Sequence, residues 1–176
     1  SVGTVAASAT RLQRESGIDD NPDAHFEDMG LFKPEMANRD HLGFRRLLVD
    51  HAPETIALLE EMGVVFMGPL PEPPHRVPRL HAIIPHSRGF IDHLTRACQT
   101  YDVTIKTGQK VTRLIYEESR VKGVVVDTGA GQEEAIFATR SVVIASGDFS
   151  AAKSDYKQKF MTGPLLEIGG INPLST

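Results

Sequence analysis

The sequence predicts an α/β protein with α+β elements, into which a three-stranded antiparallel β-meander is inserted. Two observations predict this class. Amphipathic helical segments are followed by short apolar strands, which is typical of an α/β arrangement. Before the last of these strands the chain has three alternating, turn-bounded runs, at residues 110–116, 120–127 and 135–139. A plain doubly wound domain would have another helix there, so the runs indicate a meander inserted into a parallel α/β arrangement.

Residues 1–62 are predicted to be the helical part of the chain. Asp20-Asn21-Pro22 places a cap residue before a proline at the first helical position, which is typical of a helix start. Gly17 and Gly63 are typical helix stops. Since Pro53 permits a fresh helix start, the apolar spacing on either side of it predicts two helices. The helices expected in this part span residues 5–14, 24–29, 42–51 and 53–62.

Residues 68–86 form a proline-rich loop in this prediction. Prolines cannot donate a backbone hydrogen bond, so we expect an irregular path over a site or a solvated connection. The loop follows a short strand and precedes a helix–strand–meander–strand block that spans residues 87–149. The remaining expected elements are strands at 64–66, 103–106 and 142–145 and helices at 87–100 and 151–160. We expect residues 1–176 to form a single partial domain.

The composition is that of an ordinary globular protein, with 40% hydrophobic and 24% charged residues and a net charge of −4. No basic excess indicates nucleic acid, and no polybasic or long apolar run indicates a membrane. The first residues turn polar too soon for a signal peptide. The single cysteine, Cys98, cannot form an internal disulfide, so we expect a reducing, cytoplasmic location. A start at Ser1 without methionine and an end at Thr176 indicate a piece of a longer polypeptide.

The turn after the last predicted strand is the first candidate for a binding site. Val142–Ala145 runs into Ser146, Gly147 and Asp148, and a segment that can start a helix follows. In an α/β protein this order places a tight turn at the carboxyl end of a strand, where ligands are usually bound. Free backbone N–H groups at such a turn can face a nucleotide phosphate. A plain strand-to-helix turn has the same pattern, so both interpretations stay open.

Several segments in this order resemble the flavoprotein family of fumarate reductase and succinate dehydrogenase, whose relatives include flavin-dependent ketosteroid dehydrogenases. The block GFIDHLTRACQTYDVTIKTGQKVTRLIYEESRVKGVVV is similar to the family's helix, strand and meander, and VVIASGDFSA resembles its ATGG turn. GVVF at residues 63–66 is similar to another family element. Gly3 and Thr4, ahead of AASATRLQ, resemble its GG-x-x-A segment, and INPLST resembles the lead-in to its TGDG motif.

The resemblance implies FAD binding. In the family, the GG-x-x-A segment lies beside the flavin, which matches Gly3 and Thr4. A valine on a meander strand contacts adenine through its backbone, which matches Val111. The ATGG turn lies near the ribose and pyrophosphate, which matches Ala145, Ser146, Gly147 and Asp148. Asp148 replaces the second glycine, and its carboxylate would be repelled by a pyrophosphate unless it points away or finds a partner.

The resemblance also implies hydride transfer between the flavin and an activated carbon–carbon bond of a small organic substrate, either a dicarboxylate, a ketosteroid or a similar enone. The sequence has no G-x-G-x-x-G after an opening strand, and the family's catalytic arginine and histidines match no residue here. We therefore expect the chain by itself to bind FAD poorly, to show no turnover and to self-associate.

The proline-rich loop holds further candidates. Arg79 or His81 could contact an anionic substrate or phosphate, and solvated loop residues are the alternative. His75, His81 and His86 lack the spacing of a metal site, so none is assigned. Two other functions stay open: a non-enzymatic nucleotide-binding or protein-interaction α/β module, and an α/β enzyme that uses these histidines with a metal. The absence of a G-x-S-x-G elbow argues against a hydrolase.

Overall fold

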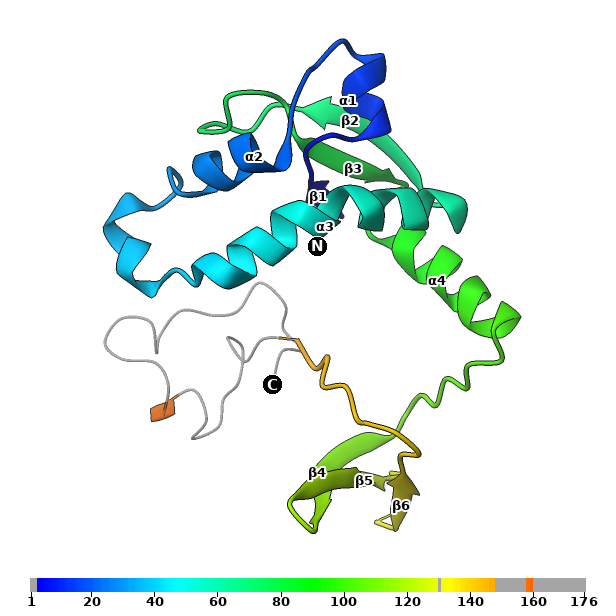
Figure 1. Ribbon diagram of the computed structural model, residues 1–176. Helices are drawn as coiled ribbons and strands as arrows, with labels where there is room; N and C mark the ends of the chain where they lie inside the picture. Colours follow the sequence, from blue (N-terminus) through cyan, green and yellow to red (C-terminus); the bar gives the residue numbers. More distant parts are fainter. Residues whose placement is uncertain (1–2, 130, 148–157, 160–176) are drawn as a thin grey trace. The chain divides into compact units, whose positions relative to one another are not determined.

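The computed structural model describes residues 3–129, 131–147 and 158–159 (Figure 1). The chain divides into two compact units, the first up to Thr104 and the second from Ile105, and each is described by itself. In the described part, no helix is long and apolar enough to cross a membrane.

A small antiparallel sheet organises the first unit. Its strand order is β1–β3–β2, so β3 is central and the other two strands form the edges. The strands are β1 (Thr4–Ala6), β2 (Val65–Leu70) and β3 (Leu80–Ile84). The pairing joins segments that are far apart in the sequence, such as Thr4 with Ala82.

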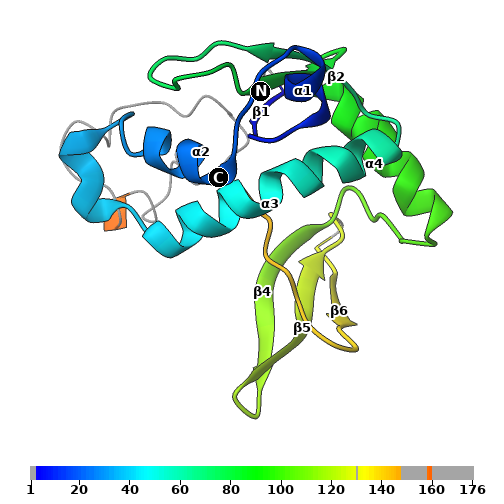
Figure 2. The same cartoon turned by 45° about the horizontal axis from the view of Figure 1, so that its top comes forward.

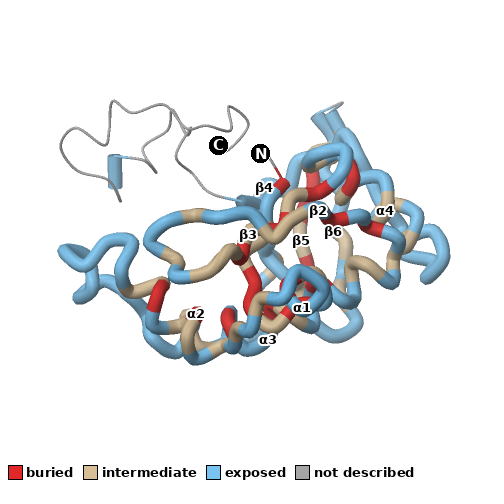
Figure 3. Tube along the Cα trace, turned by 90° about the horizontal axis from the view of Figure 1, so that it is seen from above, coloured by how far each residue is buried: buried red, intermediate tan, exposed pale blue. Residues whose placement is uncertain are grey.

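The core of the first unit lies between this sheet and the long helix α3 (Leu42–Glu61). In Figure 3 the buried positions are red; on β3 they are His81 and Ile83, and on β2 Phe66. The buried apolar cluster consists of Ala7, Ala52, Ile56, Val64, Phe66 and Ile83. The prediction of two helices around Pro53 was wrong, because α3 continues through it. Pro53 removes one hydrogen bond, but the burial of Val49, Ala52 and Ile56 on the same helix holds both halves in place.

The first helix is shorter than predicted. Residues 4–6 form β1, and α1 (Arg11–Glu15) begins only after Thr10, which closes a capping box with Gln13. Pairing of Val5 and Ala6 with β3 overrides the helical propensity of the alanines. Helix α2 (Pro22–Met29) starts where predicted, because Asn21 accepts a hydrogen bond from the Ala24 N–H. The short 3₁₀ helix η1 (Pro34–Arg39) was not predicted.

The proline-rich loop is more regular than predicted. Strand β2 extends to Leu70, and residues 80–84 form β3. Pro69 is compatible with β2 because an edge strand needs hydrogen bonds on one side only. Helix α4 (Arg88–Thr100) confirms the predicted helix, and Gly89 lets it approach β3, since a Cβ there would lie 2.8 Å from the Ile83 side chain. Residues 103–106 form no strand, so that prediction was wrong.

The second unit confirms the predicted meander (Figure 2). Strands β4 (Lys110–Glu117), β5 (Arg120–Asp127) and β6 (Glu133–Phe137) pair antiparallel in this order. Positive φ angles at Glu118 (49°) and Ser119 (60°) make the two-residue turn between β4 and β5, which matches the twist of a hairpin.

The fold class is confirmed as a mixture of helices and small antiparallel sheets. Within the described ranges every strand pair is antiparallel, so the expected parallel arrangement is not found there. Residues 142–145 form no strand in the structure, and the helix expected at 151–160 lies outside the described residues except for 158 and 159.

Candidate functional site

Gly3 and Thr4 lie at the edge of the first unit's sheet. Thr4 is exposed and pairs with Ala82 on one side only, because β1 is an edge strand. Gly3 is buried with φ +74°, and its carbonyl accepts a hydrogen bond from the Ile83 N–H at 2.9 Å. A Cβ at Gly3 would lie 2.7 Å from the Ser87 nitrogen, so only glycine fits this close approach.

The other predicted cofactor residues lie in the second unit. Val111 is 55% exposed on β4, which is an edge strand, so the outer side of its backbone has no partner within the sheet. Ala145, Ser146 and Gly147 are exposed. Gly147 has φ +81° with no heavy atom within 4 Å of its Cβ position, so a bulky group can approach its backbone. Asp148 lies outside the described residues.

Arg79 is the centre of a buried ion cluster in the first unit. Its side chain has 0% exposure. Nε donates to Oδ2 of Asp20 and Nη2 donates to Oδ1 of the same carboxylate, each at 2.7 Å. Nη1 donates at 2.5 Å to Asp28. The carboxylates are themselves buried, with side-chain exposures of 2% and 1%. All three guanidinium nitrogens donate to these two carboxylates. An anionic substrate could therefore bind Arg79 only by displacing one of the two carboxylates.

Further polar groups complete this cluster. The backbone N–H and Nε of Arg76 donate to Asp28 at 2.9 and 2.7 Å, and Nε2 of Gln13 donates to Asp20 at 2.8 Å. Neither aspartate was predicted from the sequence as a site residue. Their position around a helix cap gives no sign that they bind an arginine 59 and 51 residues away.

The cluster shifts several pKa values. Burial alone would raise the pKa of Asp28, but hydrogen bonds from Arg76 and Arg79 outweigh it and lower the pKa to about 2. Burial is the largest cause that lowers the pKa of His25 to about 4, and the nearby Arg79 charge lowers it further. The cluster therefore holds its carboxylates ionised, while burial and the Arg79 charge keep His25 neutral near pH 7.

His81 joins β3 to the segment after β1. Its Nε2 lies 2.8 Å from the Thr10 hydroxyl, and burial lowers its pKa. The Ala7 N–H donates to the Arg79 carbonyl at 3.1 Å. Residues 7–10 are thus fixed at both ends, to Arg79 just before β3 and to His81 on β3. Between these anchors, the Ser8 hydroxyl is buried without a hydrogen-bond partner among the described residues.

The side chains of the three loop histidines do not form a cluster. His81 is buried under Thr10, His75 contacts Arg79, and His86 is exposed. Within the residues that the structure describes, no group of three or more histidine, cysteine or acidic side chains is placed to hold a metal ion.

A protein-family model covers nearly the whole chain. Residues 1–172 match the model of a family described as the FAD binding domain. The chain belongs to the FAD-binding domain family. FAD is therefore its cofactor, and the resemblance found in the sequence is confirmed.

Two solved structures share the fold of this FAD-binding chain. The open conformation of a flavocytochrome c3 fumarate reductase matches with a TM-score of 0.76 and 23% identity, over 86% of this chain and 27% of that one. A 3-ketosteroid-Δ4-(5α)-dehydrogenase from Rhodococcus jostii RHA1, in complex with 4-androstene-3,17-dione, matches with a TM-score of 0.70 and 20% identity, over 86% of this chain and 38% of that one. The chain thus spans well under half the length of either protein.

Proposed function

We propose that this chain is the cofactor-holding part of an FAD-dependent oxidoreductase that transfers a hydride between the flavin and an activated carbon–carbon bond of a small organic substrate. The match of residues 1–172 to the FAD-binding domain carries the proposal. The fumarate reductase and the ketosteroid dehydrogenase support a dicarboxylate, a ketosteroid or a similar enone as substrate. When bound, FAD supplies the hydride-accepting and hydride-donating chemistry, and the protein orients the reactants.

The described residues fit this cofactor. Thr4 and Val111 lie on edge strands, where the outer backbone groups are not used by the sheet and can bind a cofactor. At Gly147 the open, left-handed backbone admits a phosphate to the N–H groups of the turn. We therefore propose Gly3, Thr4, Val111, Ala145, Ser146, Gly147 and Asp148 as the residues that hold FAD, in a Rossmann-like arrangement.

The Arg79 cluster supports the cofactor segment in this proposal. Arg79 and His81 hold residues 7–10 through one backbone and one side-chain hydrogen bond, and those residues follow β1, which begins at Thr4. A direct contact of Arg79 or His81 with the substrate stays a prediction. Because both side chains are buried, that contact requires a rearrangement of the loop.

An absorbance scan tests the function. The purified chain is incubated with FAD, desalted and scanned for flavin bands, in parallel with a Gly147→Val variant and a Gly108→Val control. Gly108 also has a positive φ (+70°) with open space around it, but it lies outside the proposed site. We expect weak flavin retention by the chain, a further loss for Gly147→Val and no change for the control. Equal retention by both variants would contradict the proposed phosphate turn.

Activity and assembly are tested on the same preparation. We expect no turnover of fumarate or of a 3-ketosteroid by these residues alone, since both related proteins are more than twice as long. We also expect self-association, because large apolar side chains of α3, including Phe44, Leu47 and Leu48, are more than half exposed. A monomer by light scattering would contradict the second expectation.

A further inference from the structure

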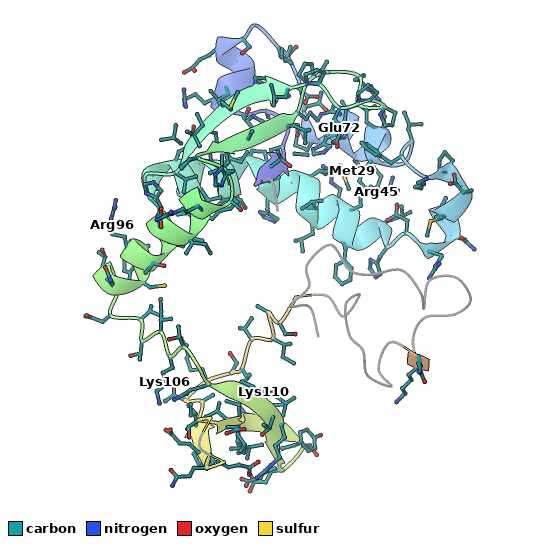
Figure 4. All side chains as sticks on the ribbon, turned by 180° about the vertical axis from the view of Figure 1, so that it is seen from behind. Met29, Arg45, Glu72, Arg96, Lys106 and Lys110 are labelled. Atoms are coloured by element: carbon teal, nitrogen blue, oxygen red, sulfur yellow. The ribbon has the colours of Figure 1, made fainter. Side chains whose placement is uncertain are left out.

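We propose that an open hollow lined by the end of α2, η1 and the start of α3 binds a small carboxylate with an apolar body. The hollow lies within the first unit and has a volume of about 300 Å³, at the lower end of the range for small-molecule pockets. Figure 4 labels two of its lining residues, Met29 on α2 and Arg45 on α3. None of the proposed FAD-binding residues lines it.

One part of the lining is apolar and adaptable. Met29, Phe32 and Met36 line the hollow, and the last two remain 39% and 44% exposed. Methionine side chains adapt to ligands of different shape because they are unbranched and polarisable. This part of the lining suits a short aliphatic or aromatic group.

Arg45 is a fixed part of the wall. Its side chain is only 11% exposed, Nη1 donates to the Phe26 carbonyl at 3.2 Å, and Nη2 is paired with Asp40. The guanidinium also lies over the Phe26 ring, 5.0 Å from its centre. Gly30 makes room for it, since a Cβ there would lie 3.0 Å from Nη1. Arg45 and Asp40 thus form a preorganised, nearly neutral wall.

The remaining charges of the lining are positive. Lys33 lies 3.7 Å from Glu35, but both side chains are about two-thirds exposed, so this pair is weak. Arg39 has no ion-pair partner in the part of the chain that the structure describes. Two cations beside an apolar lining favour an organic anion, and the planar guanidinium of Arg39 matches a carboxylate with two parallel hydrogen bonds.

Methyl-labelled methionine provides a local test. The sequence has five methionines, and the Met29→Leu and Met36→Leu variants assign the two that line the hollow. The 176-residue chain is titrated with phenylacetate and, separately, with phenethylamine, a cation of similar size. We expect the Met29 and Met36 signals to shift and saturate with phenylacetate only. Arg39→Gln should weaken binding about tenfold, because a charge-assisted contact is lost.

Arg96→Gln provides the matched control, since Arg96 is exposed on α4 and does not line the hollow (Figure 4). We expect phenylacetate to bind this variant as it binds the unmodified chain, with and without FAD. Three results would each overturn the proposal: equal shifts of all five methionines without saturation, equal shifts with phenethylamine, or unchanged affinity in Arg39→Gln. Loss of the phenylacetate shifts on adding FAD would also overturn it, because the hollow would then belong to the flavin site.

Discussion

Replacement of Arg79 by methionine is the strongest test of how the first unit is held together. Methionine keeps an unbranched apolar stem of similar length but removes the charge and every donor. Asp20 and Asp28 would then remain 2% and 1% exposed without the guanidinium that now contacts both of them. Arg76 would still donate to Asp28, and Gln13 would still donate to Asp20.

The expected loss follows from this burial. Removing one partner of a buried ion pair costs about 3–5 kcal/mol, because a buried charge is left uncompensated. A domain of this size has a total free energy of unfolding of about 5–15 kcal/mol. In a unit of about 100 residues, each kcal/mol of lost stability lowers the melting temperature by roughly 4–8 °C. We therefore expect the melting temperature to fall by about 12 °C or more.

Thermal unfolding of Arg79→Met beside Arg11→Met measures this effect. Arg11 also binds two carboxylates, those of Glu15 and Glu60, with contacts of 2.7 and 2.6 Å. Its side chain is 52% exposed, so water screens the pairs and we expect a far smaller change. Equal losses in the two variants would refute the reasoning, because burial would then not decide the strength of the pairs.

A neutral triple variant covers the case in which Arg79→Met does not fold. Asp20→Asn and Asp28→Asn, combined with Arg79→Met, remove the uncompensated charges and should restore part of the lost stability. If the triple variant is less stable than Arg79→Met, the lost stability comes from packing and not from buried charge.

Three further predictions concern the same unit. The folded-state pKa of His25 is lowered from 6.5 to about 4, so the chain should lose stability as the pH falls from 6.5 towards 4. In melting experiments at different pH, His25→Gln should reduce this loss. His51→Gln, at an exposed position, should not. Ser8→Ala should leave the melting temperature without FAD unchanged or raised, because it removes a buried hydroxyl that has no partner among the described residues; a large drop would show that the hydroxyl is bonded. Gly3→Ala should lower the melting temperature more than Gly17→Ala, because both glycines have φ near +73° but only Gly3 has backbone atoms against its Cβ position; equal losses would contradict the close packing at Gly3.

Local patterns predicted the elements whose stability is local. The cap at Asn21 and Pro22 gave the start of α2, and the alternating runs gave the meander of the second unit. The sequence was also sufficient to predict the cofactor, because several short segments resemble a family in the same order. Exposed residues such as Thr4 and Val111 could be proposed for the site by that resemblance alone.

Elements that depend on distant partners were missed. Strands β1 and β3 are short, and β1 becomes a strand only through pairing with β3, more than 70 residues away. Pro53 usually ends a helix, but buried side chains on both sides of it keep α3 continuous. The Arg79 cluster was not predicted because its two aspartates are distant in the sequence. A charged residue in a proline-rich segment is also usually solvated.

The ion cluster explains how a proline-rich segment can be held in one place. Pro71, Pro73, Pro74 and Pro78 provide no N–H groups, so the segment cannot be fixed by a regular backbone ladder. Hydrogen bonds of side chains replace the ladder and join the segment to Asp28 on α2, to Asp20 before α2 and to Gln13 on α1. The start of β3 is thereby fixed, and with it residues 7–10, which bond to β3 next to the proposed flavin segment. A change at Arg79 should therefore weaken FAD binding as well as stability, although no atom of Arg79 needs to touch the cofactor.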